Sequence, residues 1–403
     1  MTDTSLLDAA APIDRFRALL MADPALQQRL SVIAEQDLFV EAVIAAAAEA
    51  GIGLTEVEAN ASLKSDPLDM WRFSGAPVTS DTAPEGDWLP IAIVPSMGEL
   101  AVDWAHFAER PLSDSFFEDS LRRARHRPLN RLVRPRTPLQ ALAAPSGEEP
   151  RLPAGFVFHQ SRCGSTLVSQ MLATDARNVV VSEAPPIDSI VQLVASRTDV
   201  PIEPRVALLR MIVGALGRDR LGGGGDYVVK LDSWHTLALP LFRLAFPDTP
   251  WVFLYRDPIE ILVSHARMAG AQTVPGAMPF EPYGIENAAE MAPDDYAARA
   301  LGRTAEAVIE HLGLGGGMLV NYTDLPEAVE ARILPHFGIV PDEQGKAALA
   351  AASGRDAKAP LERFARDSDA KQQAANDKLR ANAALHMDEP YRRLEELRSA
   401  GEK

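Results

Sequence analysis

The chain has 403 residues and a formal net charge of −16 at pH 7, and 47% of its residues are hydrophobic. The excess of acidic residues argues against nucleic acid as a partner, because a phosphate backbone is bound through a basic surface. No apolar run reaches the roughly 18 residues of a membrane span, and the start Met1-Thr2-Asp3-Thr4 lacks the basic residues of a secretory signal. The single cysteine, Cys163, excludes an intramolecular disulfide. We therefore expect a cytoplasmic protein with one large core.

The first sixty residues predict a small all-α unit. Apolar residues at helical spacing mark three helices; Asp23-Pro24 opens the second, and the third covers residues 38–50 and is closed by Gly51. Residues 65–86 are rich in Pro, Gly, Ser, Asp and Thr, which is typical of a linker. We predict a helical domain over residues 1–64, a linker over 65–86 and a larger domain over 87–403, with its core at 150–345.

The segment before this core carries fewer signals. A strand is expected at residues 88–94, at the edge of a sheet because Pro90 and Pro95 bound it, and a helix at residues 103–125. Seven arginines then lie between positions 122 and 136. They could form a basic lip that attracts an acidic acceptor, or a solvated face, which is the interpretation that we favour.

A strand, a tight loop and a helix are predicted at residues 155–172. An apolar run passes into a polar turn around Gly164, and apolar residues return at helical spacing after Thr166. Such a loop directs several backbone N–H groups and the positive end of the helix dipole at one point, where an anion binds favourably. Gly164 permits close approach, Ser165 and Thr166 add hydroxyl donors, and Arg162 can grip a phosphate or sulfate with two parallel bonds.

This loop differs from the G-x-x-x-x-G-K-[ST] loop of nucleoside-triphosphate enzymes. That loop needs a Lys beside the terminal phosphates, and this chain has no Lys between Lys64 and Lys230. A kinase or ATPase is therefore disfavoured. The alternative to an anion-binding loop is an ordinary strand-to-helix turn.

A second anion site is predicted after residues 251–255, another apolar strand. The strand ends at Arg256, where Asp257 is a good N-cap, Pro258 suits the first helical position and Glu260 completes a capping pattern. Ser264 follows about two helical turns later. An Arg at a strand end and a hydroxyl on the next helix can hold a second phosphate, a nucleoside's length from the first.

Strands and helices alternate between these two sites, with strands at residues 178–182, 227–231 and 251–255. This alternation predicts an α/β fold, a P-loop-like three-layer sandwich with a central parallel sheet. Ligands of such sheets bind at the carboxyl ends of the strands. Arg162, Glu183, Lys230 and Arg256 all fall at predicted strand ends.

Two such sites on one sheet resemble the sulfotransferase superfamily, which uses 3′-phosphoadenosine-5′-phosphosulfate. The resemblance covers about residues 150–345 and also includes Phe246-Pro247 and a Y-x-x-L turn that begins at Tyr322. The spacing is closest to the Golgi-type protein-tyrosine branch. There a Glu base follows the loop Arg by the interval that separates Glu183 from Arg162 here. The loop departs from the family in Ser161, Cys163 and Ser165, where Pro, Ser and Thr are usual.

The resemblance implies a role for each of these residues. Glu183 would take the proton of an acceptor hydroxyl, Lys230 would neutralise the bridging oxygen, and Arg162 would hold the phosphosulfate. No metal is required for this chemistry, since side chains and backbone amides supply the positive charge; the chain also has no H-E-x-x-H motif and no Cys cluster. The residues implied in nucleotide binding are Ser161, Arg162, Cys163, Gly164, Ser165, Thr166, Arg256, Ser264 and Tyr322.

Two points stay open around this site. The rival bases are His159, His235 and His265, because cytosolic relatives use a His, although each is more often a core or surface residue. Cys163 is either a small packing residue, which we favour, or a thiol with a lowered pKa.

The N-terminal helices carry a second, less specific resemblance. Their D-P-x-L-Q pattern at Asp23, followed by an Ala-rich helix and Gly51, resembles the leader-peptide domains of nitrile-hydratase and nitrogen-fixation type. This implies a Tyr or Ser hydroxyl of a peptide as acceptor. The alternatives are a small hydroxylated metabolite or lipid, and a non-catalytic nucleotide-binding scaffold. The helices could also be a generic appendage or a dimerisation unit, which leaves a homodimer open.

Overall fold

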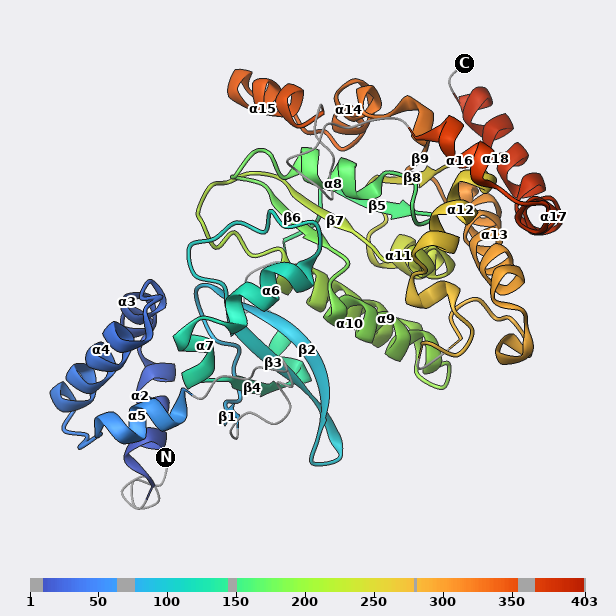
Figure 1. The fold of residues 1–403 in the computed structure, drawn as a ribbon. Coiled ribbons are helices and arrows are strands. Elements are labelled where there is room, and N and C mark those ends of the chain that lie inside the picture. Colours follow the sequence, from blue (N-terminus) through green and yellow to red (C-terminus); the bar gives the residue numbers. More distant parts are fainter. Residues whose placement is uncertain (1–9, 64–76, 144–150, 279–280, 354–366, 402–403) are drawn as a thin grey trace. The chain divides into compact units, whose positions relative to one another are not determined.

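A computed structural model describes residues 10–63, 77–143, 151–278, 281–353 and 367–401 of the chain (Figure 1). The chain divides into two compact units. The first comprises Met1–Pro111, Phe117–Pro150 and Arg220–Gly222, and the second comprises Leu112–Phe116, Arg151–Asp219 and Gly223–Lys403. Among the described residues, no helix combines the length and the apolar character needed to cross a bilayer.

The first unit begins with the predicted helices. They are α2 (Pro12–Ala22), α3 (Pro24–Ser31), α4 (Gln36–Glu49) and α5 (Glu56–Ser62). Asp23 caps α3 by accepting the Leu26 N–H at 3.0 Å, as its position before Pro24 predicts. Thr55 and Glu58 form a capping box at α5. The helical character of this segment is thus confirmed, because its start signals are local.

A four-stranded sheet follows in the same unit, with the order β1-β4-β3-β2. Its strands are β1 (Val78–Thr79), β2 (Trp88–Ser96), β3 (Glu99–His106) and β4 (Pro135–Pro138). The predicted edge strand is confirmed as β2. The helix predicted at 103–125 is wrong in its first part, where β3 pairs with β2. The reason is the two-residue turn at Met97 and Gly98, both with positive φ, which closes a β-hairpin.

Helical structure resumes only with α6 (Phe117–Arg125) and α7 (Pro128–Leu132), followed by the 3₁₀ turn η2 (Leu139–Leu142). The arginines of this segment mostly make contacts inside the unit. Arg127 donates to the Ser31 carbonyl at 2.9 Å, Arg131 to the Gln36 side chain at 3.1 Å, and Arg136 binds Asp103. A solvated face is therefore wrong for these three, which bind the N-terminal helices and β3. The predicted domain boundaries at 64 and 87 stay a prediction.

The second unit contains the predicted parallel sheet, with five strands in the order β6-β7-β5-β8-β9 (Figure 1). All its strand pairs are parallel. The strands are β5 (Gly155–His159), β6 (Val179–Ser182), β7 (Tyr227–Lys230), β8 (Trp251–Tyr255) and β9 (Gly317–Asn321). The predicted α/β fold class is confirmed.

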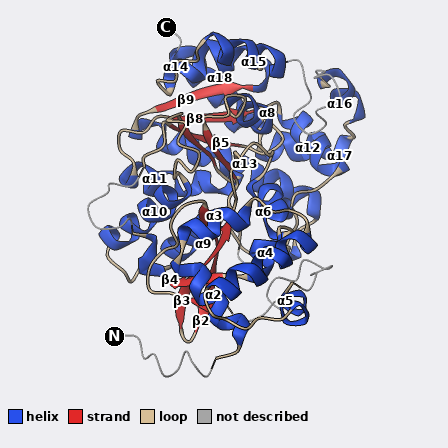
Figure 2. Cartoon of the chain, turned by 90° about the vertical axis from the view of Figure 1, so that its left-hand side faces the viewer, coloured by secondary structure: helices blue, strands red, loops and turns tan. Residues whose placement is uncertain are grey.

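Successive side chains of the central strand β5 pack on opposite faces of the sheet. Val157 belongs to a core that includes Leu167 and Met171 of α8 (Ser165–Leu172). Phe156 and Phe158 contact Phe242 of α11 (Leu239–Ala245) with ring centroids 5.3 and 5.5 Å apart. Helices therefore cover both faces, which gives the expected three layers (Figure 2).

The remaining helices complete these layers and the C-terminal segment. The α-helices are α9 (Pro185–Ser196), α10 (Ile202–Leu216), α12 (Pro258–Arg267), α13 (Pro293–His311), α14 (Leu334–His336), α15 (Glu343–Ser353), α16 (Ser368–Ala374), α17 (Asp377–His386) and α18 (Asp388–Gly401). Shorter helical segments are η3 (Ser233–Ala238), η4 (Ala271–Thr273), η5 (Ala288–Glu290), η6 (Leu312–Leu314), η7 (Tyr322–Asp324) and the π-helical η8 (Val329–Ile333).

Candidate functional site

The predicted site residues follow the carboxyl ends of the five parallel strands. In the order of the sheet, they are Glu183 after β6, Lys230 at the end of β7, the loop 160–164 after β5, Arg256 after β8 and Tyr322 after β9. Parallel strands all end at one edge of their sheet, so the topology brings together residues that are far apart in the sequence. This arrangement at one sheet edge is confirmed.

The loop after β5 adopts an uncommon backbone conformation. Ser161, Arg162 and Gly164 have φ angles of 68°, 52° and 89°, in the left-handed region that non-glycine residues seldom occupy. A Cβ at position 164 would lie 2.6 Å from the Leu325 side chain and 3.0 Å from the Tyr322 ring. Gly164 is therefore required for the close approach of Tyr322, in addition to any approach of a ligand.

Arg162 is the loop's half-buried cation. Its Nη2 donates to the Met268 carbonyl at 2.8 Å, and it forms no ion pair with another described residue. Burial lowers the pKa of Arg162, and the nearby carboxylate of Glu183 acts in the opposite direction. The guanidinium thus keeps donors for an anion and lies within electrostatic reach of Glu183.

Glu183 and Lys230 form a buried ion pair between neighbouring strand ends. Lys230 is 1% exposed, and its Nζ donates to Glu183 Oε1. The Phe116 ring, which the sequence did not single out, lies 5.0 Å from Nζ. Burial raises the pKa of Glu183, but Lys230 and His159 outweigh it and hold that pKa well below its usual range. Glu183 is therefore a carboxylate at neutral pH.

The other loop side chains are buried. Cys163 donates its thiol to the Leu254 carbonyl at 3.1 Å, and burial raises its pKa to about 11. The alternative of a thiol with a lowered pKa is wrong, and the packing interpretation is confirmed. Ser165 and Thr166 form the first turn of α8 and are largely buried. Their roles in anion binding stay predictions.

Arg256 is paired with carboxylates of its own chain. Its Nε donates to Glu260 at 2.5 Å, its Nη2 donates to Asp367 at 2.5 Å, and its guanidinium carbon lies 3.7 Å from the centre of the Tyr322 ring. Asp257 caps α12 as predicted, accepting the Glu260 N–H at 3.2 Å. The Glu260 side chain, however, turns to Arg256 and not back to the N-cap. No local pattern predicts the contact with Asp367, which lies 111 residues away in the chain.

Helix α16 supplies further groups around Arg256. Lys371 Nζ lies 2.9 Å from Asp367, and the Ser368 hydroxyl donates to Glu260 at 3.0 Å. The predicted hydroxyl of Ser264 donates to the Glu260 carbonyl at 3.0 Å, within its own helix. Lys358, a second lysine of the C-terminal segment, lies outside the described residues. The second site is thus a network of charges and not an isolated Arg.

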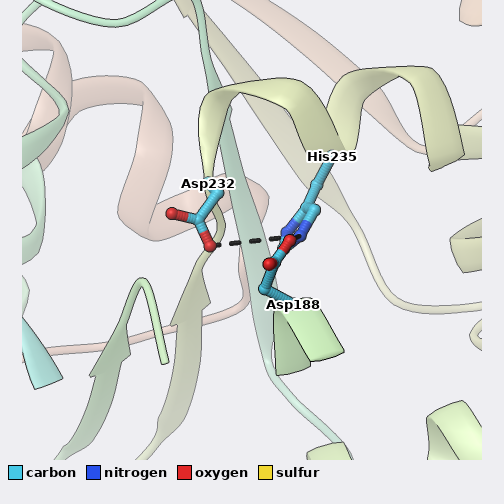
Figure 3. A group of neighbouring side chains, drawn as sticks. All are labelled: Asp188, Asp232 and His235. Carbon is cyan, nitrogen blue, oxygen red and sulfur yellow. Dashed lines mark hydrogen bonds and ion pairs between the residues drawn. The ribbon is translucent and has the colours of Figure 1, made fainter. Parts of the chain in front are cut away.

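A further polar cluster contains Asp188, Asp232 and His235 (Figure 3). His235 Nε2 lies 2.9 Å from Asp188 and 3.9 Å from Asp232, and the Trp234 indole donates to Asp188 at 2.7 Å. Burial raises the pKa of Asp232 to about 7. Two carboxylates and an imidazole could hold a divalent metal. The fit is incomplete, because a ligand His normally donates its other N–H, and Nδ1 of His235 is buried without a described partner.

His265 lies in the core and not at a strand end. Its Nδ1 contacts the Thr273 hydroxyl at 3.2 Å, and the residue is buried on α12. This agrees with the common role of a buried core histidine. His159 lies beside Glu183 and is taken up below.

Comparisons with known proteins give only distant likenesses. No family model matches the chain, and no curated protein is significantly similar to it. Among solved structures, it is similar to the sulfotransferase domain from the curacin biosynthetic pathway (14% identity, 58% of this chain and 98% of that chain, TM-score 0.37). It is also similar to sulfotransferase STF9 from Mycobacterium avium (12% identity, 60% of this chain and 77% of that chain, TM-score 0.39). A third similar structure is sulfotransferase STF1 from Mycobacterium tuberculosis H37Rv (16% identity, 52% of this chain and 74% of that chain, TM-score 0.35).

Proposed function

We propose that the protein is a sulfotransferase, which transfers the sulfuryl group of 3′-phosphoadenosine-5′-phosphosulfate to an acceptor hydroxyl. The observation that carries this proposal is the Lys230–Glu183 ion pair beside the loop of Arg162, at the ends of adjacent parallel strands. A cation for the leaving phosphate, a carboxylate for the proton and an anion-binding loop are the groups that this transfer needs.

In the proposed reaction, the acceptor oxygen attacks sulfur while the bond from sulfur to the 5′-phosphate oxygen breaks. The electron pair of that bond stays on the phosphate, where Lys230 and Arg162 stabilise the negative charge. Glu183 takes the hydroxyl proton. Glu183 is ionised at neutral pH, and its weak basicity in the ion pair would rise when Lys230 turns from it to the leaving phosphate. The products are a sulfate ester and 3′-phosphoadenosine-5′-phosphate.

The nucleotide would extend along the sheet edge. Residues 161–166 would hold the 5′-phosphosulfate, and Arg256, Ser264 and Tyr322 would hold the 3′-phosphate. Cys163 would contribute through its backbone, since its thiol donates to Leu254. In the described structure the Asp367 carboxylate binds Arg256 Nη2, so the 3′-phosphate would replace a carboxylate at this position.

A peptide hydroxyl, such as that of a tyrosine, is the acceptor that we favour. The support is the leader-like pattern of the N-terminal helices and the spacing of Glu183 from Arg162. The runner-up is a small hydroxylated metabolite or lipid. Deleting residues 1–75 should abolish peptide sulfation but leave transfer to a small phenol. The phenol reaction is also the control for folding, because the Trp88 indole donates to Gln27 of α3 at 2.8 Å and would lose that partner.

Calorimetry tests the nucleotide class. We expect 3′-phosphoadenosine-5′-phosphate to bind tightly and ATP and GTP to bind weakly, since the loop has no Lys for a triphosphate. Arg162→Ala is the control for binding at the loop, and its affinity for 3′-phosphoadenosine-5′-phosphate should be lower than that of the wild type. Binding of ATP or GTP but not of the bisphosphate would overturn the proposal. Binding of the bisphosphate without transfer to any acceptor would favour the non-catalytic scaffold.

A further inference from the structure

His159 contacts both the loop and the proposed base. It is the last residue of β5, directly before the loop, and only 4% of it is exposed. Its Nδ1 accepts the Ser161 N–H at 3.0 Å. Its Nε2 lies 3.3 Å from Glu183 Oε1. One buried ring therefore lies between Ser161 of the anion loop and the carboxylate that would take the acceptor's proton.

The contact with Ser161 determines which nitrogen of His159 carries the proton. A ring nitrogen that accepts an N–H has no proton of its own, so the neutral imidazole carries its proton on Nε2, which faces Glu183. Burial lowers the pKa of His159; Glu183 and a backbone group of Leu231 oppose this change, and Lys230 reinforces it. The ring is therefore neutral at neutral pH, with one donor directed to the Glu183 side.

The second contact is loose in the described structure. Nε2 makes no well-aligned hydrogen bond with any described residue, and its distance to Glu183 is long for one. Glu183 is instead bound to Lys230. During transfer, Lys230 would also donate to the leaving phosphate. Glu183 would then share the Lys230 ammonium group, its hydrogen-bond donor in the described structure, with the nucleotide. Catalytic hydrogen bonds that are long in a free enzyme often tighten in the reacting complex.

We propose that His159 is a positioning residue: its Nδ1 holds the Ser161 amide, and its Nε2–H orients Glu183 while Lys230 turns to the nucleotide. This inference rests on the proposed function. It assigns His159 no proton transfer to or from the acceptor, in contrast to the rival-base role. Through these two contacts, the ring links the position of the Ser161 amide in the anion loop to the position of the Glu183 carboxylate. An apolar packing residue at this position would not link them.

The tautomer can be measured without any turnover. NMR spectra of the full-length protein with ¹⁵N-labelled histidine rings identify the His159 signals as those that disappear in His159→Asn. At pH 7 these signals should be those of a neutral ring with its proton on Nε2. Glu183→Gln should shift its Nε2 signal more than its Nδ1 signal. A charged ring, or a proton on Nδ1, would overturn the proposal. Because this test needs no substrate, its failure is separate from a failure to detect sulfuryl transfer.

Two substitutions separate the two contacts. His159→Asn keeps an oxygen near the Nδ1 position for the Ser161 N–H and removes the donor to Glu183; His159→Gln extends its amide toward Glu183 and leaves the Ser161 N–H without its acceptor. We expect kcat to fall about tenfold to a hundredfold in the Asn variant, with an unchanged Kd for 3′-phosphoadenosine-5′-phosphate. In the Gln variant, that Kd should rise about threefold to tenfold and kcat should change less.

A purely structural role predicts another outcome. Both variants would then lower the melting temperature and reduce kcat and nucleotide affinity together, without the split, and the proposal would be overturned. Melting temperatures measured on the same samples show how far each variant is destabilised. If no acceptor is found, the Kd of the bisphosphate in the two variants still tests the loop contact.

Discussion

The two ends of the proposed nucleotide site hold the same residue type in different ways. Arg162 and Arg256 follow neighbouring parallel strands, β5 and β8. Arg162 is half-buried and donates to one backbone carbonyl, whereas Arg256 is 4% exposed and binds Glu260 and Asp367. An anion can therefore reach Arg162 without replacing a carboxylate, but at Arg256 it competes with Asp367. The proposed phosphosulfate end would therefore bind its anion without displacing a carboxylate, whereas the proposed 3′-phosphate end would exchange Asp367 for a phosphate.

A related difference lies in the origin of the contacts. The loop end is built from β5, the following turn and adjacent strand ends, which the sheet holds in place. The Arg256 end depends on α16, which belongs to the C-terminal segment of the chain. Substitutions at the two ends should therefore have different consequences.

Lys230→Met should have the largest effect. It removes the cation for the leaving phosphate, and kcat should fall about 10²–10³-fold, as measured by single-turnover transfer. It also leaves Glu183 without its ion-pair partner, and urea unfolding should show a loss of about 3 kcal/mol. The matched control is the double variant with Glu183→Gln, which should regain most of the stability and none of the activity. Full activity of Lys230→Met would remove Lys230 from the mechanism.

Glu183→Gln should lower kcat by about 10²-fold, because the amide cannot take the acceptor's proton. Calorimetry should show that 3′-phosphoadenosine-5′-phosphate still binds. Unimpaired turnover in this variant would exclude Glu183 as the base and would make His235 the next residue to test.

Arg256→Ala and Asp367→Asn should change nucleotide affinity in opposite directions. Removing the Arg should raise the Kd of the bisphosphate about tenfold or more, since a charge-assisted bond is lost. Neutralising Asp367 should lower the Kd about threefold to tenfold, because the phosphate then meets less competition. The control is Asp369→Asn, on the exposed side of the same helix, which should leave the Kd unchanged. A weaker affinity in Asp367→Asn would show that Asp367 supports the nucleotide and does not compete with it.

The Lys230–Glu183 pair should also appear in the pH dependence of stability. The pKa of Glu183 is lower in the folded than in the unfolded chain, so its contribution is present above the unfolded value of about 4.3 and is lost as the pH falls toward the folded value. Below pH 4 the wild type should therefore lose stability more steeply than the Lys230→Met, Glu183→Gln double variant, by about 1 kcal/mol. Chemical denaturation at several acidic pH values measures this, and parallel curves would contradict it.

Cys163 should show the smallest effect. With a pKa of about 11, the thiol is almost entirely protonated at pH 8, so iodoacetamide should label it slowly in the native protein and quickly in urea. Cys163→Ala should change kcat less than about twofold, because the loop's backbone forms the binding groups. Rapid native labelling that nucleotide blocks would instead indicate a reactive thiol at the site.

Local signals in the sequence determined the helices, the parallel strands and the edge at which the site residues lie. Residue periodicity and caps such as Asp23 and Asp257 act over a few positions, so they can be read without the fold. They failed at residues 103–106, where pairing of β3 with β2 outweighed a helical pattern.

The groups that surround each charge come together only when the whole chain is folded. The sequence placed Arg256 at a strand end, but Asp367 reaches it through folding of a segment 111 residues away. It named His159 as a rival base, yet its place between Ser161 and Glu183 depends on the order of β6, β7 and β5 in the sheet. Ion pairs and hydrogen bonds between distant segments leave no periodic pattern in a sequence, and their strength depends on burial that only the packed chain provides.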